Sequence, residues 1–298
     1  MTAVRLAASS TGKSRRVTWP RLGAAGSTAL TVLAVVVALA VFAPLIAPQD
    51  PDQGTLLDAF ARPGAGHWLG TDATGRDIAS RLIYGARTSL LGPAAIVVVS
   101  LALSIPLGLI AAWRGGAAAW VISRGLDVVF AIPGLLLAIL VAALFGPGLT
   151  AAVIALGVAY VPYVARLVVT AAEHERRLPY VQALSVQGLG VLRITTVHML
   201  RNLAPVIAGQ ATVAFAYSLI DLAGLSFLGL GVQPPLADWG AMVSDRDAVL
   251  QGYPGQVIAA SVAIVATALS LFILGSRLSG EQPRFSRRRL RNQEAKAQ

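Results

Sequence analysis

Residues 178–202 read LPYVQALSVQGLGVLRITTVHMLRN, a polar-flanked segment that lies between long apolar runs and has two glycines at its middle. Residues that share one helical face occur on both sides of these glycines: Val181, Leu184 and Gly188 first, then Leu192, Thr195 and Met199. Pro179 suits the first turn of a helix, where its missing N–H costs nothing. The segment therefore predicts two short amphipathic helices joined at a turn containing Gly188 and Gly190. They are expected outside the bilayer, with an apolar face that the chain's own membrane helices need not cover and that a partner can bind.

The composition is that of a membrane protein. Of the 298 residues, 56% are hydrophobic and 13% are charged, and the mean hydropathy is +0.70. A soluble domain carries about twice that charged fraction, so the net charge of +10 must lie in the few segments that meet water. The chain has no cysteine, which excludes disulfides, zinc-thiolate sites and cysteine nucleophiles.

Both ends of the chain are basic. Residues 1–21 carry five basic residues and no acid, and residues 277–298 carry seven basic residues and two acids. The positive-inside rule therefore predicts two cytoplasmic tails, residues 1–23 and 277–298. The run at residues 284–291 could bind RNA or anionic lipid. A topology signal that lies on the membrane lipid is favoured, with no nucleic-acid partner.

Six apolar stretches are long enough to cross the hydrocarbon, which takes about 20 residues at about 1.5 Å rise. They predict an all-α polytopic membrane protein whose membrane domain covers residues 24–276. The six spans are expected at about 24–46, 89–113, 118–145, 150–172, 203–223 and 255–275, with a cytoplasmic loop at 173–202. The first stretch also fits a signal peptide, but it is longer than a typical h-region, so an uncleaved anchor is favoured.

Two short runs that suggest catalytic chemistry fail on their spacing. Residues 10–14, STGKS, match the end of a phosphate-binding loop, but the first glycine of that motif falls on Ala7 and no strand precedes it. No other nucleotide loop is present, so the chain is not expected to hydrolyse ATP or to be an enzyme. Residues 173–177, EHERR, lack the second histidine of a zinc-protease helix because Leu178 stands there. They predict a solvated cytoplasmic charge run.

Three polar residues of the expected external loop at residues 48–84 are candidate metal ligands. His67, Asp72 and Asp77 could suggest a metal site. Loop carboxylates that cap turns and helices are the commoner outcome, so capping is favoured and no metal or cofactor is expected in this chain.

The expected spans contain few ions. Arg124 and Asp127 are three residues apart and should pair on one helix face. Asp221 lies in the fifth span, and an acid near membrane depth is a functional candidate by default. Pro133 predicts a kink in the third span, which is tolerated where a helix lines a cavity. Asp221 and Pro133 are therefore the candidates for a substrate pathway, while a capped or snorkelled structural role for Asp221 stays open.

The segment that opened this section resembles the EAA loop of permease subunits of binding-protein-dependent ABC importers. Residues that hold the register of that loop are Tyr180, Val181, Gln182, Ala183, Gly188, Leu192, Arg193, His198 and Asn202. The resemblance implies that they couple the chain to a separate ATPase subunit by docking in its groove. Gln182 stands where the family usually has glutamate, so docking is expected to be weaker or altered, because an amide still hydrogen-bonds but carries no charge.

Two further segments resemble the dipeptide, oligopeptide and nickel branch of the same family. These are residues 67–87, which contain HWLGTD, and residues 224–235, GLSFLGLGVQPP, with Trp239 and Gly240 following at the usual place. In related permeases a glutamate commonly stands at the position of Leu222. The adjacent Asp221 need not inherit that place, because one residue along a helix rotates a side chain by about 100°.

The resemblance implies a permease subunit in the cytoplasmic membrane that belongs to an ATP-driven importer. Its implied partners are a second, homologous permease chain, two ATPase subunits that hold ATP and magnesium, and an external solute-binding protein. Peptides are the implied cargo, with nickel or another small solute as an alternative. An ion-coupled secondary carrier is the competing function. It is disfavoured because Asp221 and Arg166 are too few and too close to the expected membrane interfaces.

Overall fold

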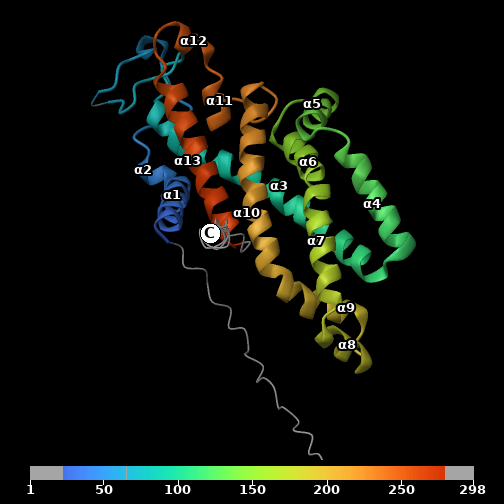
Figure 1. The fold of residues 1–298 in the computed structure, drawn as a ribbon. Helices are drawn as coiled ribbons and strands as arrows, with labels where there is room; N and C mark the ends of the chain where they lie inside the picture. The colour runs from blue at the N-terminus through green and yellow to red at the C-terminus, as the bar shows by residue number, and fades with distance from the viewer. Residues whose placement is uncertain (1–22, 65, 279–298) are drawn as a thin grey trace, which may run out of the picture.

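The computed structural model describes residues 23–64 and 66–278, which form helices joined by short connections (Figure 1). Within these residues the only β-type pairings are two isolated bridges, Gly54 with Arg76 and Thr71 with Asp77. The predicted all-α fold is confirmed. The phosphate-loop-like run at residues 10–14 and nearly all of both basic tails lie outside the described residues.

Five continuous helical stretches of the described chain are long and apolar enough to cross a membrane. They are Gly23–Val41 (α1), Ile78–Arg114 (α3), Leu149–Arg176, Val191–Phe227 and Gly255–Leu278 (α13). The third consists of α6 (Leu149–Ala159) and α7 (Val161–Arg176), and the fourth of α9 (Val191–Arg193), a π-helical segment (Ile194–Met199) and α10 (Leu200–Phe227). A bent pair, α4 (Gly116–Phe130) and α5 (Gly134–Phe145), makes a sixth candidate. The predicted count of six is reached when this pair is one span.

Two of these helices run well beyond the spans expected from hydropathy. The span expected at 89–113 is the later part of α3, and the one expected at 203–223 is the middle of the helical stretch Val191–Phe227. Apolar runs mark the part of a helix that suits hydrocarbon, whereas backbone hydrogen bonding continues into polar residues until a cap or a breaker ends it. The helices therefore extend outside the apolar core at one or both ends.

Pro133 breaks the third apolar stretch more sharply than the predicted kink. α4 ends at Phe130, α5 begins at Gly134, and their axes differ by 75°. Pro133 has an extended ψ of 130° and precedes α5 as its N-cap residue. A proline has no N–H for the helix ladder and its ring clashes with the preceding turn. The helix therefore stops and restarts here in a new direction.

Short elements connect the long helices. They are α2 (Ala43–Ile46), a 3-10 turn (Leu56–Asp58), α8 (Pro179–Val186), α11 (Trp239–Val243) and α12 (Arg246–Leu250). Trp239 is buried, and its indole Nε1 donates to the carbonyl of Leu82 on α3 at 2.8 Å. The segment after α10 is thereby fastened to α3. In Figure 1, α12 lies at one end of the molecule and α8 and α9 at the other.

Close packing of α3 on α7 forms the centre of the fold. At Gly108 an added Cβ would lie 2.6 Å from Val168 Cγ1, so only glycine allows the two helices to approach this closely. One buried cluster lies toward α8 and contains Leu109, Val168 and Val181. A second surrounds Ile96, Leu156 and Leu222.

Two carboxylates organise the loop that leads into α3. Asp77 caps the helix, since its Oδ2 accepts from the N–H and the hydroxyl of Ser80, both at 2.7 Å. Its Oδ1 lies 3.1 Å from His67 Nδ1. Asp72 accepts from the N–H groups of Thr74 and Arg76 and from Arg76 Nε at 2.8 Å. The predicted capping role is confirmed for both aspartates.

We expect the loop around Asp72 to loosen in acid. Burial alone would raise the pKa of this carboxyl, but the hydrogen bonds from Arg76 and Thr74 outweigh burial and hold the pKa below the ordinary value of 3.8. A carboxyl with a lowered folded-state pKa stabilises the loop above about pH 4, and this stabilisation is lost as the pH falls through the folded-state pKa. The protection of residues 70–80 from hydrogen exchange in lipid nanodiscs, relative to the intrinsic exchange rate at each pH, should therefore fall below about pH 4 in the wild type.

Two variants check this assignment. Asp72→Asn should exchange faster at neutral pH and show a weaker acid response, because its side chain does not titrate. Asp58→Asn, which changes an exposed carboxylate of the same loop, should keep the wild-type acid response. An undiminished acid response in Asp72→Asn would assign the effect to another group.

Candidate functional site

The loop at residues 177–192 begins as one short helix. α8 starts at Pro179 after Leu178 in extended conformation, and it ends in a Schellman turn. In that turn Leu189 N–H donates to the carbonyl of Leu184, and Gly188 N–H donates to that of Ser185. Gly188 has a φ of +82°, the left-handed conformation that favours glycine. The glycine turn was thus correctly predicted.

The second short helix of the prediction does not exist as a separate element. After Gly190, α9 continues through the π-helical segment into α10 without a break. No glycine lies between Gly190 and Gly209, and Pro205 is accommodated inside the helix. The loop is therefore one short helix, a glycine turn and the projecting start of a long helix. A π-helical segment is rare and is often found at functional positions.

The predicted docking face of α8 is covered by the chain itself. Val181 is 3% exposed and Leu184 is half-buried, and both pack in the cluster that contains Leu109 of α3 and Val168 of α7. The expectation that the protein's own helices leave this face open was wrong. Helical spacing shows which residues share a face, but it does not show that α8 folds back under the ends of α3 and α7.

The apolar residues that do face solvent lie around the glycine turn. Val186 is 88% exposed, Leu192 is 76% exposed and Val191 is 48% exposed. We call residues 186–192 the exposed tip. Exposed apolar side chains gathered at the end of a projecting loop are typical of a surface that contacts another protein.

A buried carboxylate anchors this loop to two long helices. Glu175, near the end of α7, is 9% exposed, and its Oε1 accepts from Tyr180 Oη at 2.5 Å and from Asn202 Nδ2 at 2.8 Å. Asn202 Nδ2 also lies 3.1 Å from Tyr180 Oη. We call Glu175, Tyr180 and Asn202 the anchor triad. It joins α7, α8 and α10 at one point.

The electrostatics of the triad favour a neutral phenol beside the carboxylate. Burial, followed by the hydrogen bond to Glu175, raises the pKa of Tyr180 to about 12. The hydroxyl therefore stays protonated and remains a donor at every physiological pH. Because both donors converge on one oxygen, removal of the carboxylate leaves two polar groups without their acceptor.

The prediction of a solvated charge run at residues 173–177 was therefore wrong at Glu175, whereas the other four residues are exposed. Glu175 is buried in the triad. Arg176 keeps an exposed surface, but its Nη1 donates to the carbonyls of Ala112 and Trp113 at the end of α3. A cation there satisfies carbonyls that the helix leaves unpaired and complements the negative end of its dipole. Helical spacing did not mark Glu175 in the sequence, because the break at residues 177–178 separates Glu175 on α7 from Tyr180 on α8.

The remaining residues of the sequence-predicted coupling set divide into two groups. Gln182, Ala183, Gly188, Leu192 and Arg193 are exposed, whereas His198 is half-buried. Gln182 faces solvent, so the expected weakening of partner docking by its missing charge stays a prediction. The structure thus separates residues that hold the loop in place, such as Val181, from residues available to a partner.

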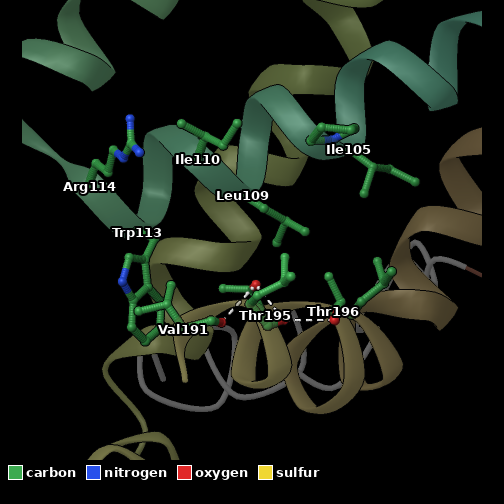
Figure 2. Close-up of a pocket in the computed structure, with 11 residues that line it drawn as sticks. Ile105, Leu109, Ile110, Trp113, Arg114, Val191, Thr195 and Thr196 are labelled. Carbon is green, nitrogen blue, oxygen red and sulfur yellow. Dashed lines mark hydrogen bonds between the residues drawn. The ribbon is translucent and has the colours of Figure 1, made fainter. Parts of the chain in front are cut away.

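An apolar cavity of about 530 Å³ lies behind the exposed tip (Figure 2). Its walls are the end of α3 and the stretch from Val191 to Leu200: Ile105, Pro106, Leu109, Ile110, Trp113, Arg114, Val191, Leu192, Thr195, Thr196 and Leu200. The hydroxyls of Thr195 and Thr196 are satisfied by helix carbonyls. The anchor triad holds the exposed tip to α7 and α10, and the cavity separates the tip from the end of α3.

The two candidates for a substrate pathway converge on a second cavity, of about 290 Å³. It is lined by Phe130, Gly134, Ala159, Tyr160, Tyr163, Tyr217 and Asp221. Pro133 immediately precedes Gly134 at the break between α4 and α5. Tyr160, at the junction of α6 and α7, donates to Asp221 Oδ2 at 2.7 Å. Leu222 is instead buried against Ile96, which agrees with the predicted rotation between the two neighbouring positions.

An ion-pair network lies beside this cavity. The predicted pair of Arg124 and Asp127 is present at 3.1 Å. Arg166 of α7 joins it at 2.7 Å from the other carboxylate oxygen, and its guanidinium lies 4.6 Å from the centre of the Phe130 ring. The network ties α4 to α7, and it holds Arg166 away from Asp221.

We expect Gly188→Ala to destabilise the exposed tip through backbone strain. An added Cβ meets no atom within 4 Å, so the cost is the left-handed conformation, about 1–2 kcal/mol. Hydrogen exchange of residues 179–189 should rise by about 5- to 30-fold. Gly190→Ala is a matched control, because Gly190 is equally open but has a φ of −64°. Equal exchange in the two variants would contradict this role of Gly188.

The chain is similar in sequence to known membrane transport proteins. Residues 104–280 match the family described as binding-protein-dependent transport system inner membrane component. The chain is 41% identical to the di/tripeptide transport system permease protein DppC of Pseudomonas aeruginosa over 246 residues, which cover 78% of this chain and 81% of that protein. It is 33% identical to the probable D,D-dipeptide transport system permease protein DdpC of Escherichia coli, with 84% and 85% covered. It is 36% identical to the glutathione transport system permease protein GsiD of Pectobacterium atrosepticum, with 82% and 81% covered.

Proposed function

The chain belongs to the family of inner membrane components of binding-protein-dependent transport systems and is a multi-pass permease subunit of an importer, and from this premise we propose that its cargo is a peptide. The relatives named above are permeases for dipeptides, tripeptides and glutathione, and each is 33–41% identical to this chain over the aligned residues. The matched region contains both cavities and the exposed tip.

We further propose that the exposed tip docks on a separate ATPase subunit. The end of the molecule that carries α8 and α9 is then cytoplasmic, and the end that carries α12 is external, where a solute-binding protein delivers the cargo. A second permease chain completes the pathway and two ATPase subunits supply ATP and magnesium. This chain provides no nucleotide site of its own in this scheme.

The observation that carries the proposal is the anchor triad. It fixes α8 to the end of α7 and to the start of α10, so displacement of the tip is transmitted to two spans at once. Asp221 on α10 and Tyr160 at the start of α7 lie further along the same two spans and line the inner cavity. ATP can drive transport only through its different affinity for two states of the assembly. The triad supplies the physical link between those states and the cavity.

The direct test is to purify the complex by a tag on this chain and to measure ATP hydrolysis in lipid. ATPase subunits should co-purify, and a solute-binding protein loaded with peptide should stimulate hydrolysis above the rate with the empty binding protein. Purification of the chain without an ATPase, or hydrolysis that ignores every loaded binding protein, would contradict the proposal and restore the ion-coupled carrier as an alternative.

A further inference from the structure

The cavity around Asp221 has the chemistry of a cation site. One carboxylate is surrounded by aromatic rings and small residues: Phe130, Gly134, Ala159, Tyr160, Tyr163 and Tyr217. Tyr163 and Tyr217 remain substantially exposed, at 43% and 47%, although the Tyr217 ring also makes a T-shaped contact with Phe272 at 4.9 Å between ring centres. Aromatic faces attract cations, and the attraction of a carboxylate for a cation strengthens where water is limited.

Asp221 retains an unused hydrogen-bond acceptor. Its Oδ2 accepts from Tyr160, which is the one hydrogen bond that this side chain makes to the described residues. No cation in the described part of the chain forms an ion pair with it. Arg166, which lies over the Phe130 ring at the edge of the cavity, is paired with Asp127, a carboxylate that it shares with Arg124. The negative charge of Asp221 is therefore balanced by a cation that enters the cavity, and not by a side chain of the described residues.

The donor set indicates an organic cation. A divalent metal ion takes several oxygen ligands and prefers more than one carboxylate, whereas the lining of this cavity contains one. An ammonium group needs fewer ligands, namely one or two acceptors and contact with π faces. The volume of about 290 Å³ lies at the lower end of small-molecule sites. It suits one residue of a peptide and excludes most of a longer chain.

We propose that this cavity binds the amino-terminal ammonium group of the peptide during its passage, with Asp221 as the charge partner and Tyr163 and Tyr217 contacting the group through their rings. This inference rests on the proposed function. Tyr160 then orients the carboxylate while leaving its second oxygen for the ligand. Because every peptide with a free amino end presents the same group, the cavity recognises peptides of differing side chains by one feature that they share.

The test uses the complete importer in proteoliposomes, with the binding protein loaded with a peptide that the wild type imports. Asp221→Asn keeps an oxygen that can accept from Tyr160 but removes the charge. Its maximal import rate should fall by about tenfold, which is the loss of one charge-assisted interaction. The concentration of loaded binding protein that gives half the maximal rate should change by less than about twofold, and so should stimulated ATP hydrolysis, because neither docking surface is altered. Asp221→Glu should recover much of the import rate.

Tyr160→Phe distinguishes the charge of Asp221 from the structural role of its hydrogen bond to Tyr160. It removes the hydrogen bond between α10 and the junction of α6 and α7 but leaves the carboxylate, so import should remain within about threefold of wild type. Wild-type import by Asp221→Asn, or an equal loss in Tyr160→Phe, would overturn the inference and assign Asp221 a structural role. Neither result would affect the proposed function, which the wild-type complex tests in the same experiment by importing peptide.

Discussion

The double substitution Val186→Asp, Leu192→Asp is expected to separate this chain from its ATPase partner. Both side chains face solvent in the isolated chain, so the substitutions cost little folding free energy. In a docked complex each lost apolar contact removes about 1.5–3 kcal/mol, and each buried carboxylate adds a desolvation penalty. Affinity for the ATPase should therefore fall by more than about 100-fold.

Co-purification of the ATPase with the tagged chain measures this effect. Val186→Asp alone should show an intermediate loss, and it avoids the cavity that Leu192 lines. A matched control places two aspartates at exposed apolar positions at the opposite end, Leu57 and Leu250. That control should retain the ATPase. Full retention by the double variant at residues 186 and 192 would show that the exposed tip is not the docking surface.

Glu175→Ala is expected to uncouple ATP hydrolysis from import. The substitution removes the shared acceptor of Tyr180, which is half-buried, and Asn202, which is exposed, and a hydrogen bond to a charged group contributes about 1.5–3 kcal/mol. The exposed tip keeps its own side chains, so the ATPase should still bind and hydrolyse ATP. Its movement should still reach α10 through the continuous helix Val191–Phe227 but should no longer be passed to α7. Peptide imported per ATP hydrolysed should fall by at least about tenfold.

Two further variants at residues 173–177 provide a conservative replacement and a matched control for this prediction. Glu175→Gln keeps an oxygen that accepts from both donors, so it should retain much of the coupling. Glu173→Ala removes an exposed carboxylate two residues earlier and should match the wild type. Combining Glu175→Ala with Asn202→Ala should add little further loss, because the two side chains act in one network. Normal coupling in Glu175→Ala would remove the triad from the mechanism.

The sequence predicted the features that depend on local chemistry. Runs of apolar residues located the spans, the glycine at position 188 located the turn, and Pro133 located the change of direction between α4 and α5. Asp72 and Asp77 were correctly assigned as caps, because a carboxylate next to unpaired N–H groups acts within a few residues of its own position.

What could not be predicted depends on contacts between distant segments. The face of α8 that contains Val181 is buried because the ends of α3 and α7 lie over it, and residues far away in the sequence form that cover. Glu175 looked like part of a solvated run, since its partner Asn202 lies 27 residues further along the chain. Asp221 lines a cavity together with Gly134, the residue that follows Pro133, and the sequence did not show that these two positions come close together.

The central claim is that the anchor triad transmits the state of the ATPase to the spans that line the inner cavity. The chain has no cysteine, so Leu144→Cys and Leu228→Cys can carry a pair of spin labels at exposed ends of α5 and α10. The distance between the labels should change when a non-hydrolysable ATP analogue binds to the complete importer, and the change should be much smaller with Glu175→Ala while nucleotide still binds, because only the direct helical connection from the tip into α10 remains. The same change in both backgrounds would contradict the account.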